Sequence, residues 1–479
     1  MGGNESDDPL ALELEVLDWL KEWIGYPPAS TGSLVSDGST AHLTAFGCAR
    51  ETLGSDDPVL YLSDQANSSI VRAARLLGLE ANQVRVLPSD DRFRLAPKTL
   101  RAAIEADLAR GLTPSCVVAQ GGAANTGSVD PLEGLAEVGR EHGAWLHVDA
   151  SYGGFTVLAD PGLLPGLADS DSVTLDLHRG LYQPFECGCV LVRNGHDLDP
   201  PAHLADVLEV WGSLRHFDLD AFREAIRRSL AVAAAAARRV EESETLELMA
   251  PPSLGVVCFR RRDLDEAANA GLVSALEQSG TGLISTTRLH GRFALRMCVL
   301  NHQSAPEDVE AVLASLETAD PQAPEPARER HPTIVSAWPG LPHADLPSLR
   351  ELPLFAGLEP GQAAQVAARA SLREVATGEP VIEQWDLGAE FFVIVEGTVT
   401  VTVDGQHASE LGRGDFFGEL RALEWGAGYS YPRLASIRAT SPLRLLVFPE
   451  GVLARLVERY PSLDREIREA AAERLQRHS

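Results

Sequence analysis

The sequence predicts an α/β body with a mainly parallel sheet and helices on both faces, then a small α+β lobe, and then a C-terminal β-roll or barrel capped by helices. Three observations predict this order. Short apolar runs alternate with helical patterns through the first part of the chain, a proline-rich segment interrupts it, and period-2 alternation follows. A chain of 479 residues is also long enough for two or three domains.

The body is predicted from short apolar runs that are separated by helical patterns. Expected strands lie at residues 59–62, 116–119, 145–148, 173–175 and 189–192, and expected helices at 68–79, 131–142 and 205–242. Such alternation is typical of βαβ units and a parallel sheet. Strands at 256–259 and 293–300 predict the smaller lobe. We expect one domain over residues 8–317, with a large lobe at about 30–205 and a small lobe at about 245–317.

The tail begins after a proline-rich segment at residues 318–348, which predicts an extended linker because proline fixes φ and lacks a backbone donor. Residues 349–479 form the expected C-terminal domain. Within it, apolar and polar residues alternate at 391–395 and 397–403, and the turn residues Asp404 and Gly405 follow, as is typical of a β-hairpin. Helical patterns at 361–370 and 452–476 flank this hairpin and predict the capping helices.

The chain is acidic, with a formal net charge of −28, and this disfavours nucleic acid and anionic membranes as partners. No apolar stretch reaches the roughly 20 residues that span a bilayer. The acidic N-terminus is unlike a secretory signal, and the six cysteines form neither a disulfide framework nor a zinc pattern. We therefore expect a cytoplasmic protein with reduced thiols, no metal site, and no nucleic-acid or membrane partner.

Three loops follow expected strand ends, where open α/β sheets bind ligands. The segment Ser-Asp-Gly-Ser-Thr at 36–40 opens a helical pattern, so its hydroxyl and N–H groups can hold a phosphate. Asp149 ends one strand, and Asp176-Leu-His178-Arg179 follows another. Each loop taken alone also fits an ordinary helix cap or turn.

Taken together, five segments of the body resemble one enzyme family in composition and order. They are LVSDGSTAHL at 34–43, SDQANSSI at 63–70, HVDASYGG at 147–154, DLHRGLYQP at 176–184 and TRLHGRFALR at 287–296. They resemble the group II pyridoxal-phosphate-dependent amino-acid decarboxylases, whose members act on aromatic amino acids, glutamate or cysteine sulfinate. The resemblance implies fold type I, the aspartate-aminotransferase-like architecture, and a homodimer with its sites at the subunit interface.

The resemblance also implies roles for particular residues. Asp149 matches the carboxylate that keeps the pyridine nitrogen of the cofactor protonated, which makes the ring an electron sink. Ser36, Gly38 and Ser39 match the phosphate-binding loop. His178 matches the histidine that precedes the lysine to which the cofactor is bound. Pyridoxal phosphate is therefore the implied cofactor, and in this chain we expect it to be held non-covalently if it binds.

The departures from the family lie where its chemistry is done. Arg179 stands at the Schiff-base lysine, and a guanidinium stays protonated, so it cannot form an imine. Asn67 replaces the ring-stacking histidine, Ala123 a threonine, and Asp37 a glycine beside the phosphate site. Family members also carry several tens of residues before the helix at 16–20, and this chain begins close to that helix.

Lysines elsewhere in the chain are too few to replace the missing amine. Among 41 basic residues only Lys21 and Lys98 are lysines, and both fall in helical patterns. We expect both to be solvated and remote from the site.

The tail resembles the cyclic-nucleotide-binding domain family through LPLFAGL at 352–358, EFFVIVEG at 390–397, FFGE at 416–419 and PRLAS at 432–436. This resemblance implies that Gly418 and Glu419 contact the ribose and phosphate, and that Arg433 and Ala435 complete the phosphate site. Arginine pairs with phosphate through two hydrogen bonds, and a glutamate accepts from the ribose hydroxyl. The interval from Glu419 to Arg433 is longer than is common, and Leu434 favours cyclic AMP over cyclic GMP.

Three functional hypotheses remain from the sequence. We prefer a cyclic-AMP-responsive pseudoenzyme or scaffold, in which the decarboxylase-like body is dimeric and inactive. The first alternative is an amino-acid carboxy-lyase that holds pyridoxal phosphate without a lysine link and is regulated by cyclic nucleotide. The second is a structural or assembly protein that uses neither pocket. DNA binding is not expected, because one long helix and no helix-turn-helix follows the predicted barrel.

Overall fold

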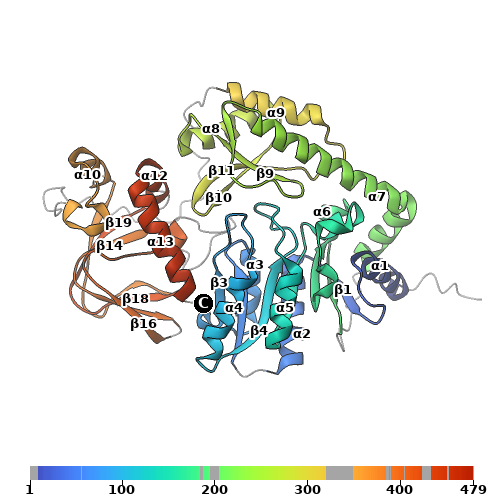
Figure 1. The fold of residues 1–479 in the computed structure, drawn as a ribbon, viewed down its shortest axis with the longest axis horizontal. Coiled ribbons are helices and arrows are strands. Elements are labelled where there is room, and N and C mark those ends of the chain that lie inside the picture. The colour runs from blue at the N-terminus through green and yellow to red at the C-terminus, as the bar shows by residue number, and fades with distance from the viewer. Residues whose placement is uncertain are drawn as a thin grey trace, which may run out of the picture.

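The computed structural model describes residues 9–54, 57–183, 187–194, 204–319, 349–367, 369–384, 388, 390–403, 405–422, 433–449 and 452–477. Residues 320–348 of the linker predicted at 318–348, the turn residue Asp404 and Pro432 of the tail motif lie outside these residues. Within them, no helix is both long and apolar enough to cross a membrane. Figure 1 shows a central body, a small lobe above it, and a C-terminal domain beside it.

The large lobe is built on a seven-stranded sheet with the order β1-β7-β6-β5-β4-β2-β3. The pairs β2/β3, β2/β4, β4/β5 and β5/β6 are parallel, and β7 runs antiparallel to both β6 and β1. The predicted parallel sheet is therefore present, with an antiparallel pairing at one edge. Its strands are β1 (Thr31–Val35), β2 (Pro58–Ser63), β3 (Val84–Leu87), β4 (Thr113–Gln120), β5 (Trp145–Asp149), β6 (Ser172–Asp176) and β7 (Gly188–Val192).

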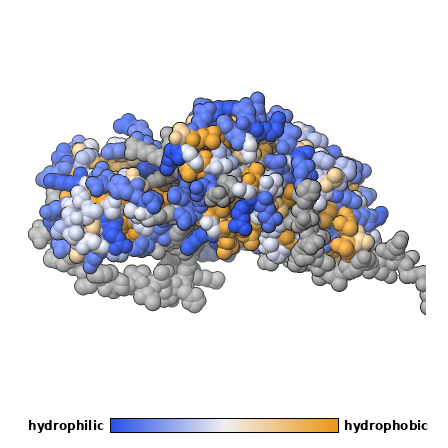
Figure 2. Space-filling model, turned by 90° about the horizontal axis from the view of Figure 1, so that it is seen from below, coloured by the Kyte–Doolittle hydropathy of each residue, from blue (hydrophilic) through white to orange (hydrophobic). Residues whose placement is uncertain are grey.

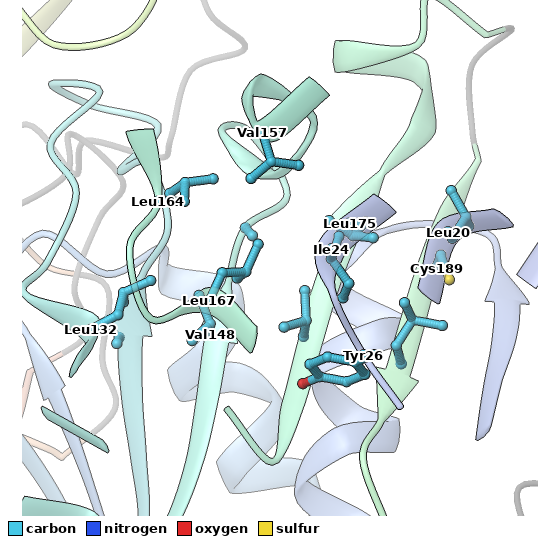
Figure 3. Close-up of a cluster of buried hydrophobic side chains, with 14 of the residues drawn as sticks. Leu20, Ile24, Tyr26, Leu132, Val148, Val157, Leu164, Leu167, Leu175 and Cys189 are labelled. Atoms are coloured by element: carbon cyan, nitrogen blue, oxygen red, sulfur yellow. The ribbon is translucent and has the colours of Figure 1, made fainter. Parts of the chain in front are cut away.

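Alternate residues of each strand enter two different cores, one on each face of the sheet. In β4, Val118 packs with helices α2 and α3, whereas Val117 packs with α1, α4 and α5. Figure 3 shows part of the second core, where Leu20 and Ile24 of α1 lie near Leu175 and Cys189 of the sheet. The helices are α1 (Pro9–Ile24), α2 (Gly38–Leu53), α3 (Ser68–Leu76), α4 (Pro97–Leu108), α5 (Leu132–His142) and α6 (Leu177–Gly180).

A long helical stretch joins the two lobes, but it is interrupted. Helix α7 (Leu204–Glu241) is bent at Asp218, where φ is 58° and the Asp218 carboxylate accepts a hydrogen bond from Ala221 N at 3.1 Å. Asp218 thus caps the second part of a stretch that the sequence predicts as continuous. Beyond it, the small lobe has a four-stranded antiparallel sheet of β8 (Leu246–Leu248), β9 (Val256–Arg261), β10 (Ser285–Leu289) and β11 (Arg292–Cys298), with α8 (Glu266–Ser279) and α9 (Pro306–Thr318).

The C-terminal domain has two four-stranded antiparallel sheets, as predicted for a β-roll. One consists of β12 (Ser371–Val375), β19 (Leu443–Phe448), β14 (Phe391–Glu396) and β17 (Phe416–Phe417). The other consists of β13 (Pro380–Ile382), β18 (Ser436–Ala439), β15 (Val399–Val403) and β16 (Gln406–Leu411). Its α-helices are α10 (Pro360–Ala367), α11 (Glu419–Ala422), α12 (Val452–Arg459) and α13 (Pro461–Arg477).

The last helical pattern, predicted as one helix over 452–476, forms two helices. Pro461 lacks the N–H that would continue α12, and it is the first residue of α13. Helix α13 lies between the C-terminal sheets and β3 of the large lobe (Figure 1). One hydrophobic cluster runs from this domain, including Leu463 and Ile467 of α13, into the α2/α3 side of the large lobe.

The molecular surface is mostly polar, as the charge predicts. Figure 2 shows that hydrophilic residues cover most of the face seen from below, with hydrophobic residues exposed in its middle and right parts. The exposed large hydrophobic residues include Leu10 and Leu14 of α1 and Leu208 and Phe217 of α7.

Candidate functional site

Two carboxylates lie at the carboxyl ends of neighbouring strands in the large lobe. Asp149 ends β5 and Asp176 ends β6, and the strand register pairs Asp149 with Thr174. Because residues two apart in a strand share a face, Asp176 is on the same face as Thr174 and Asp149. Both aspartates are buried, with 7% and 3% of their surface exposed. The predicted convergence of these strand ends is therefore present.

The predicted phosphate loop lies at the N-terminus of α2, facing these carboxylates. Asp37 is the N-cap residue, and its side chain accepts from Thr40 N at 2.8 Å. Gly38 approaches closely enough that a Cβ there would lie 3.2 Å from Asp176 Oδ1 and 3.1 Å from Ser151 Oγ. Ser36 and Ser39 are exposed at the same helix start. A side chain at position 38 would therefore require these neighbours to shift by a few tenths of an ångström, and glycine avoids this crowding.

Crowding of negative charge changes the titration of Asp176. Burial is the main cause that raises its pKa to about 7, and the neighbouring Asp149 and Asp37 raise it further, whereas Arg179 lowers it. Asp176 Oδ1 is buried without a hydrogen-bond partner in the described structure. The site therefore holds a carboxyl group that is partly protonated near neutral pH.

A buried histidine pair lies behind Asp149. His42 Nε2 is 3.7 Å from Asp149 Oδ2, and His42 Nδ1 is 3.1 Å from His147 Nε2. His147 Nδ1 is 2.8 Å from Ser172 Oγ, which also accepts from Trp145 Nε1. Burial lowers the pKa of both histidines, although Asp149 and Asp37 act in the opposite direction on the pKa of His42. Burial therefore favours the neutral form of both rings, and His42 lies directly beside Asp149.

Arg179, which the sequence predicts at the Schiff-base position, points back to the strand end that precedes it. Arg179 Nε lies 3.1 Å from Asp176 Oδ2, and the arginine side chain is 34% exposed. His178 lies beside the same acid, with its Nε2 3.8 Å from Asp176 Oδ2, and its Nδ1 is 3.1 Å from the carbonyl oxygen of Cys187. Arg179, which the sequence predicts as the main departure from the family, therefore forms an ion pair with Asp176 of the same site.

Two of the remaining departures, Asn67 and Ala123, lie in well-ordered local structure. Asn67 is the N-cap of α3, and its side-chain oxygen accepts from Ser69 N at 2.9 Å. Ala123 is fully buried, and its N–H donates to the Ser128 carbonyl at 2.8 Å. Asn67 therefore caps a helix and has no aromatic face for stacking.

One expectation about the lysines was wrong. Lys98 is exposed, as predicted, but the Lys21 side chain is only 12% exposed. Its Nζ is 2.6 Å from Asp18 Oδ1 and donates to the Ser30 carbonyl at 3.2 Å. The helical position indicated a solvated residue, but the segment after α1 folds back over the ammonium group.

The small lobe covers this edge of the large-lobe sheet. Asn125, in the loop after β4, donates to the Gln65 side chain at 3.3 Å and to the Arg288 carbonyl of β10 at 3.4 Å. Arg296 of β11 donates to the Asn125 carbonyl at 3.1 Å. The lobes therefore meet beside the carboxylates through polar contacts.

A second site lies in the C-terminal domain and contains the four residues predicted to bind cyclic nucleotide. Arg433 is 5% exposed and donates to the Glu390 carbonyl at 2.6 Å and the Gly418 carbonyl at 3.2 Å. Gly418 has φ 87°, and a Cβ there would lie 2.6 Å from Arg433 Nη1, so only glycine fits. Ala435 lines the same cavity.

Glu419, at the start of α11, is paired with the end of the chain. It is 2% exposed, and its Oε2 accepts from Arg474 Nη1 of α13 at 2.8 Å. The Arg474 guanidinium also lies 4.9 Å from the centre of the Phe416 ring. The carboxylate predicted to accept from a ribose hydroxyl is therefore already engaged by a cation.

These groups border a cavity of about 700 Å³. Pockets of roughly 300–1,000 Å³ are typical for small molecules and cofactors. The cavity brings Gly418, Glu419, Arg433 and Ala435 together, as the sequence predicts. Leu434 also lines it.

Comparison with known proteins identifies both parts of the chain. Residues 5–205 match the pyridoxal-dependent decarboxylase conserved domain. The aromatic-L-amino-acid decarboxylase of Bacillus atrophaeus is 31% identical over 345 residues, which cover 64% of this chain and 72% of that relative. The chain belongs to the pyridoxal-dependent decarboxylase family. Residues 372–460 match the cyclic nucleotide-binding domain, so the tail of this decarboxylase-family protein is such a domain.

Other relatives and solved structures agree with this assignment. The L-2,4-diaminobutyrate decarboxylase of Rhizobium meliloti (strain 1021) is 30% identical over 345 residues, covering 64% of this chain and 70% of the relative. The crystal structure of Oryza sativa TDC with PLP and tryptamine is similar with a TM-score of 0.59 and 26% identity, over 64% of this chain and 75% of that one. Mouse CSAD in apo form has a TM-score of 0.59 at 25% identity, covering 65% and 76% of the two chains.

The decarboxylase-family site fits only part of pyridoxal phosphate. Asp149, backed by His42, fits the ring nitrogen, and the unpartnered buried atoms Ser151 Oγ and Asp176 Oδ1 offer polar contacts beside Gly38. The covalent link does not fit, because position 179 carries a guanidinium and not an amine. The phosphate end is also acidic, because Asp37 and Asp176 lie there together.

Sequence reasoning missed four residues of these two sites. The motif at 176–184 includes Asp176 without assigning it a role, although its spacing of three from Arg179 indicates a contact across one helical turn. His147 precedes Asp149 by two residues in a strand, and this spacing places both on one face. His42 and Arg474 gave no such signal, because their partners are more than 50 residues away.

Proposed function

We propose that this protein is a cyclic-AMP-responsive pseudoenzyme of the decarboxylase family. In this proposal the body has lost decarboxylation and serves as a dimeric scaffold or binding module, and cyclic AMP binding to the C-terminal domain changes its state. The observation that carries the proposal is the 3.1 Å contact of Arg179 Nε with Asp176 Oδ2 at the position of the Schiff-base lysine.

Loss of catalysis is supported by three positions, Arg179, Asn67 and Ala123, each of which lacks the functional group that the resemblance leads us to expect. A guanidinium keeps its proton, so it neither attacks a carbonyl nor leaves one. Asn67 is committed to capping α3, and Ala123 has no hydroxyl to offer. Restoring one of these residues would leave the other two roles unfilled.

Nucleotide binding is supported by the tail, because both polar side chains of the expected site, Arg433 and Glu419, are present and buried. Arg433 can pair with an anionic phosphate, and Glu419 can accept from a ribose hydroxyl. Leu434 lines the cavity where a hydroxyl-bearing residue would favour guanine, and this supports cyclic AMP over cyclic GMP.

The proposal includes the organisation of the whole protein. We assign residues 8–317 to the decarboxylase-like domain, 318–348 to a linker and 349–479 to the nucleotide-binding domain. A homodimer is supported by the exposed Leu10, Leu14, Leu208 and Phe217 on the adjacent helices α1 and α7. A cytoplasmic location follows from what is typical of the family.

A second candidate is a slow carboxy-lyase that holds pyridoxal phosphate non-covalently. It is favoured by Asp149, which keeps its buried histidine support, and by the unpartnered Ser151 Oγ and Asp176 Oδ1. Turnover would be slow in this case, because the exchange of one imine for another is lost with the lysine.

Carbon dioxide release and calorimetry together test the proposal. The full-length protein is incubated with pyridoxal phosphate, with and without cyclic AMP, and with a panel that includes aromatic amino acids, glutamate, cysteine sulfinate and 2,4-diaminobutyrate. We expect no release above the blank in either condition, together with calorimetric binding of cyclic AMP. Enzyme-dependent carbon dioxide release would establish the second candidate, and an absence of cyclic AMP binding would refute the regulatory part.

A further inference from the structure

The cavity that contains Arg433 and Glu419 is not enclosed by the nucleotide-binding domain alone. Part of its wall comes from the decarboxylase domain, at the edge of the seven-stranded sheet and the turn that follows α4. These residues are Asn82, Val84, Arg85, Val86 and Arg110. The β15–β16 hairpin and α13 form other walls, including Val401, His407, Ala470 and Glu473. The cavity is therefore shared between two parts of the chain that are about 300 residues apart in sequence.

Strand β3 presents an open edge to this cavity. It is the last strand of its sheet, and β2 is its partner on the inner side. The Leu87 carbonyl accepts from Asp64 N at 2.9 Å, so Leu87 and Arg85 direct their main-chain groups inward, towards β2. Main-chain direction alternates along a strand, and Val84 and Val86 therefore direct their N–H and C=O groups outward. An open strand edge of this kind offers a row of main-chain hydrogen-bond donors and acceptors to a ligand.

Side chains on this wall are held by one buried acid. Asp107 is fully buried and accepts from Arg85 at 2.8 and 2.9 Å and from the Tyr61 hydroxyl at 3.0 Å. Arg110 Nη1 is 3.5 Å from the same carboxylate, and its side chain is 59% exposed. The wall thus combines apolar valines, outward main-chain groups and a cation beside the opening.

Helix α13 connects this wall to the nucleotide-binding residues. It contacts β3, and through Arg474 it is paired with Glu419. Arg433 and Glu419 line the same cavity, and in the proposed function they bind the phosphate and ribose. The hairpin β15–β16, helix α13 and strand β3 border the rest of this cavity, so they are available to the part of a nucleotide that extends away from these two residues.

We propose that the decarboxylase domain completes the nucleotide site: the base of a bound purine cyclic nucleotide lies against the β3 edge at Val84–Val86 and beside Arg110. This inference rests on the proposed nucleotide binding and goes beyond it by placing specificity and signalling in the contact between the domains. A purine has both donors and acceptors on its edge, which match main-chain N–H and C=O groups. Its flat face suits an arginine, which stacks on aromatic rings.

The proposal explains how occupancy of the pocket would reach the decarboxylase-like body. A ligand that contacts both domains binds best in one relative arrangement, and it shifts the protein toward that arrangement by its differential affinity. A ribose hydroxyl that donates to Glu419 also competes with Arg474 for this carboxylate, which weakens one contact of α13. Both changes reach β3, because the ligand and α13 both lie against that strand. Strand β3 pairs with β2, and its Leu87 carbonyl accepts from Asp64 N directly after β2.

Photolabelling of the full-length protein with 8-azido-cyclic AMP tests the placement of the base. Because the azide is on the base, we expect label in peptides that contain residues 82–86 or Arg110, and excess cyclic AMP should prevent it. Label found only within residues 349–477 would overturn the proposal. A protein that takes up no cyclic AMP in calorimetry contradicts the proposed function itself, so the two failures are distinguishable.

A pair of arginine variants tests the contribution of the wall. Arg110→Ala should weaken cyclic AMP binding by about threefold or more, as expected for the loss of a cation beside a ring. Arg101→Ala is the matched control, because Arg101 is another surface arginine from the α4 region with an acidic partner, Glu141, and it does not line the cavity. Equal affinities of the two variants would remove Arg110 from the site.

Discussion

Arg179 Nε and Asp176 Oδ2 lie 3.1 Å apart across the short helix α6. This contact joins the residue at the Schiff-base position to one of the acids that crowd the site. The contact lowers the pKa of Asp176, but burial outweighs it and the net pKa is about 7. Arg179 places a permanent cation in a pocket with three carboxylates and partly balances their charge.

Replacement of Asp176 by asparagine should change how stability depends on pH. The folded-state pKa is raised to about 7 from 3.8, so the folded protein binds a proton that the unfolded chain has released. The stability from this group is therefore full below about pH 4 and is lost as pH rises to 7. Asp176→Asn should gain roughly 2–3 kcal/mol relative to the parent between pH 5 and pH 8. Thermal melts at both pH values measure this, with exposed Asp169→Asn as the control. The same offset at both pH values would contradict it.

Loss of the Asn67 cap should destabilise the body without reference to any cofactor. Asn67→Ala removes the acceptor for Ser69 N and should cost about 1 kcal/mol in the free energy of unfolding. Asn67→Ser keeps an acceptor and should be close to neutral. Chemical denaturation of the parent, Asn67→Ala and Asn67→Ser measures these differences in unfolding free energy. Equal denaturation midpoints would show that the cap contributes nothing to stability.

Arg433 should be indispensable for nucleotide binding. Arg433→Ala removes a buried guanidinium that fits a phosphate, so cyclic AMP affinity should fall by about 30-fold or more. Arg438→Ala, on β18 of the same domain and 51% exposed, should bind as the parent does. Isothermal calorimetry compares them, and a folded Arg433→Ala protein with unchanged affinity would refute the assignment.

Arg474 should act against the ligand, because it occupies Glu419. Arg474→Ala removes a competitor at 2.8 Å, so cyclic AMP affinity should rise by about threefold to fivefold, the usual worth of a partly exposed ion pair. Glu419→Gln should instead lower the affinity, because it weakens the ribose acceptor. A fall in affinity for Arg474→Ala would show that Arg474 binds the nucleotide directly.

Much of the fold follows from local patterns. Alternating strands and helices predict the parallel sheet, and the antiparallel tail follows from its period-2 runs. The positions of Asp149, Gly38, Glu419 and Arg433 follow as well, because each sits in a motif at a strand or helix end.

The remainder depends on contacts that no local pattern encodes. Lys21 is buried by the segment that follows its helix, and Pro461 divides a helical pattern that otherwise continues. The pairing of His42 with Asp149 and of Arg474 with Glu419 requires the folded chain. The wall that β3 contributes to the nucleotide cavity depends on how two domains pack, which composition and periodicity do not address.

The most direct test of the central claim is covalent trapping of pyridoxal phosphate. The parent, Arg179→Lys and Arg179→Ala are each incubated with pyridoxal phosphate, reduced with borohydride and mapped by mass spectrometry. We predict a pyridoxyl adduct at position 179 in Arg179→Lys alone, because that position then carries the amine that the rest of the site surrounds. Stoichiometric adduct on Lys21 or Lys98 of the parent, with carbon dioxide release from an amino acid, would contradict the claim that this body has lost its chemistry.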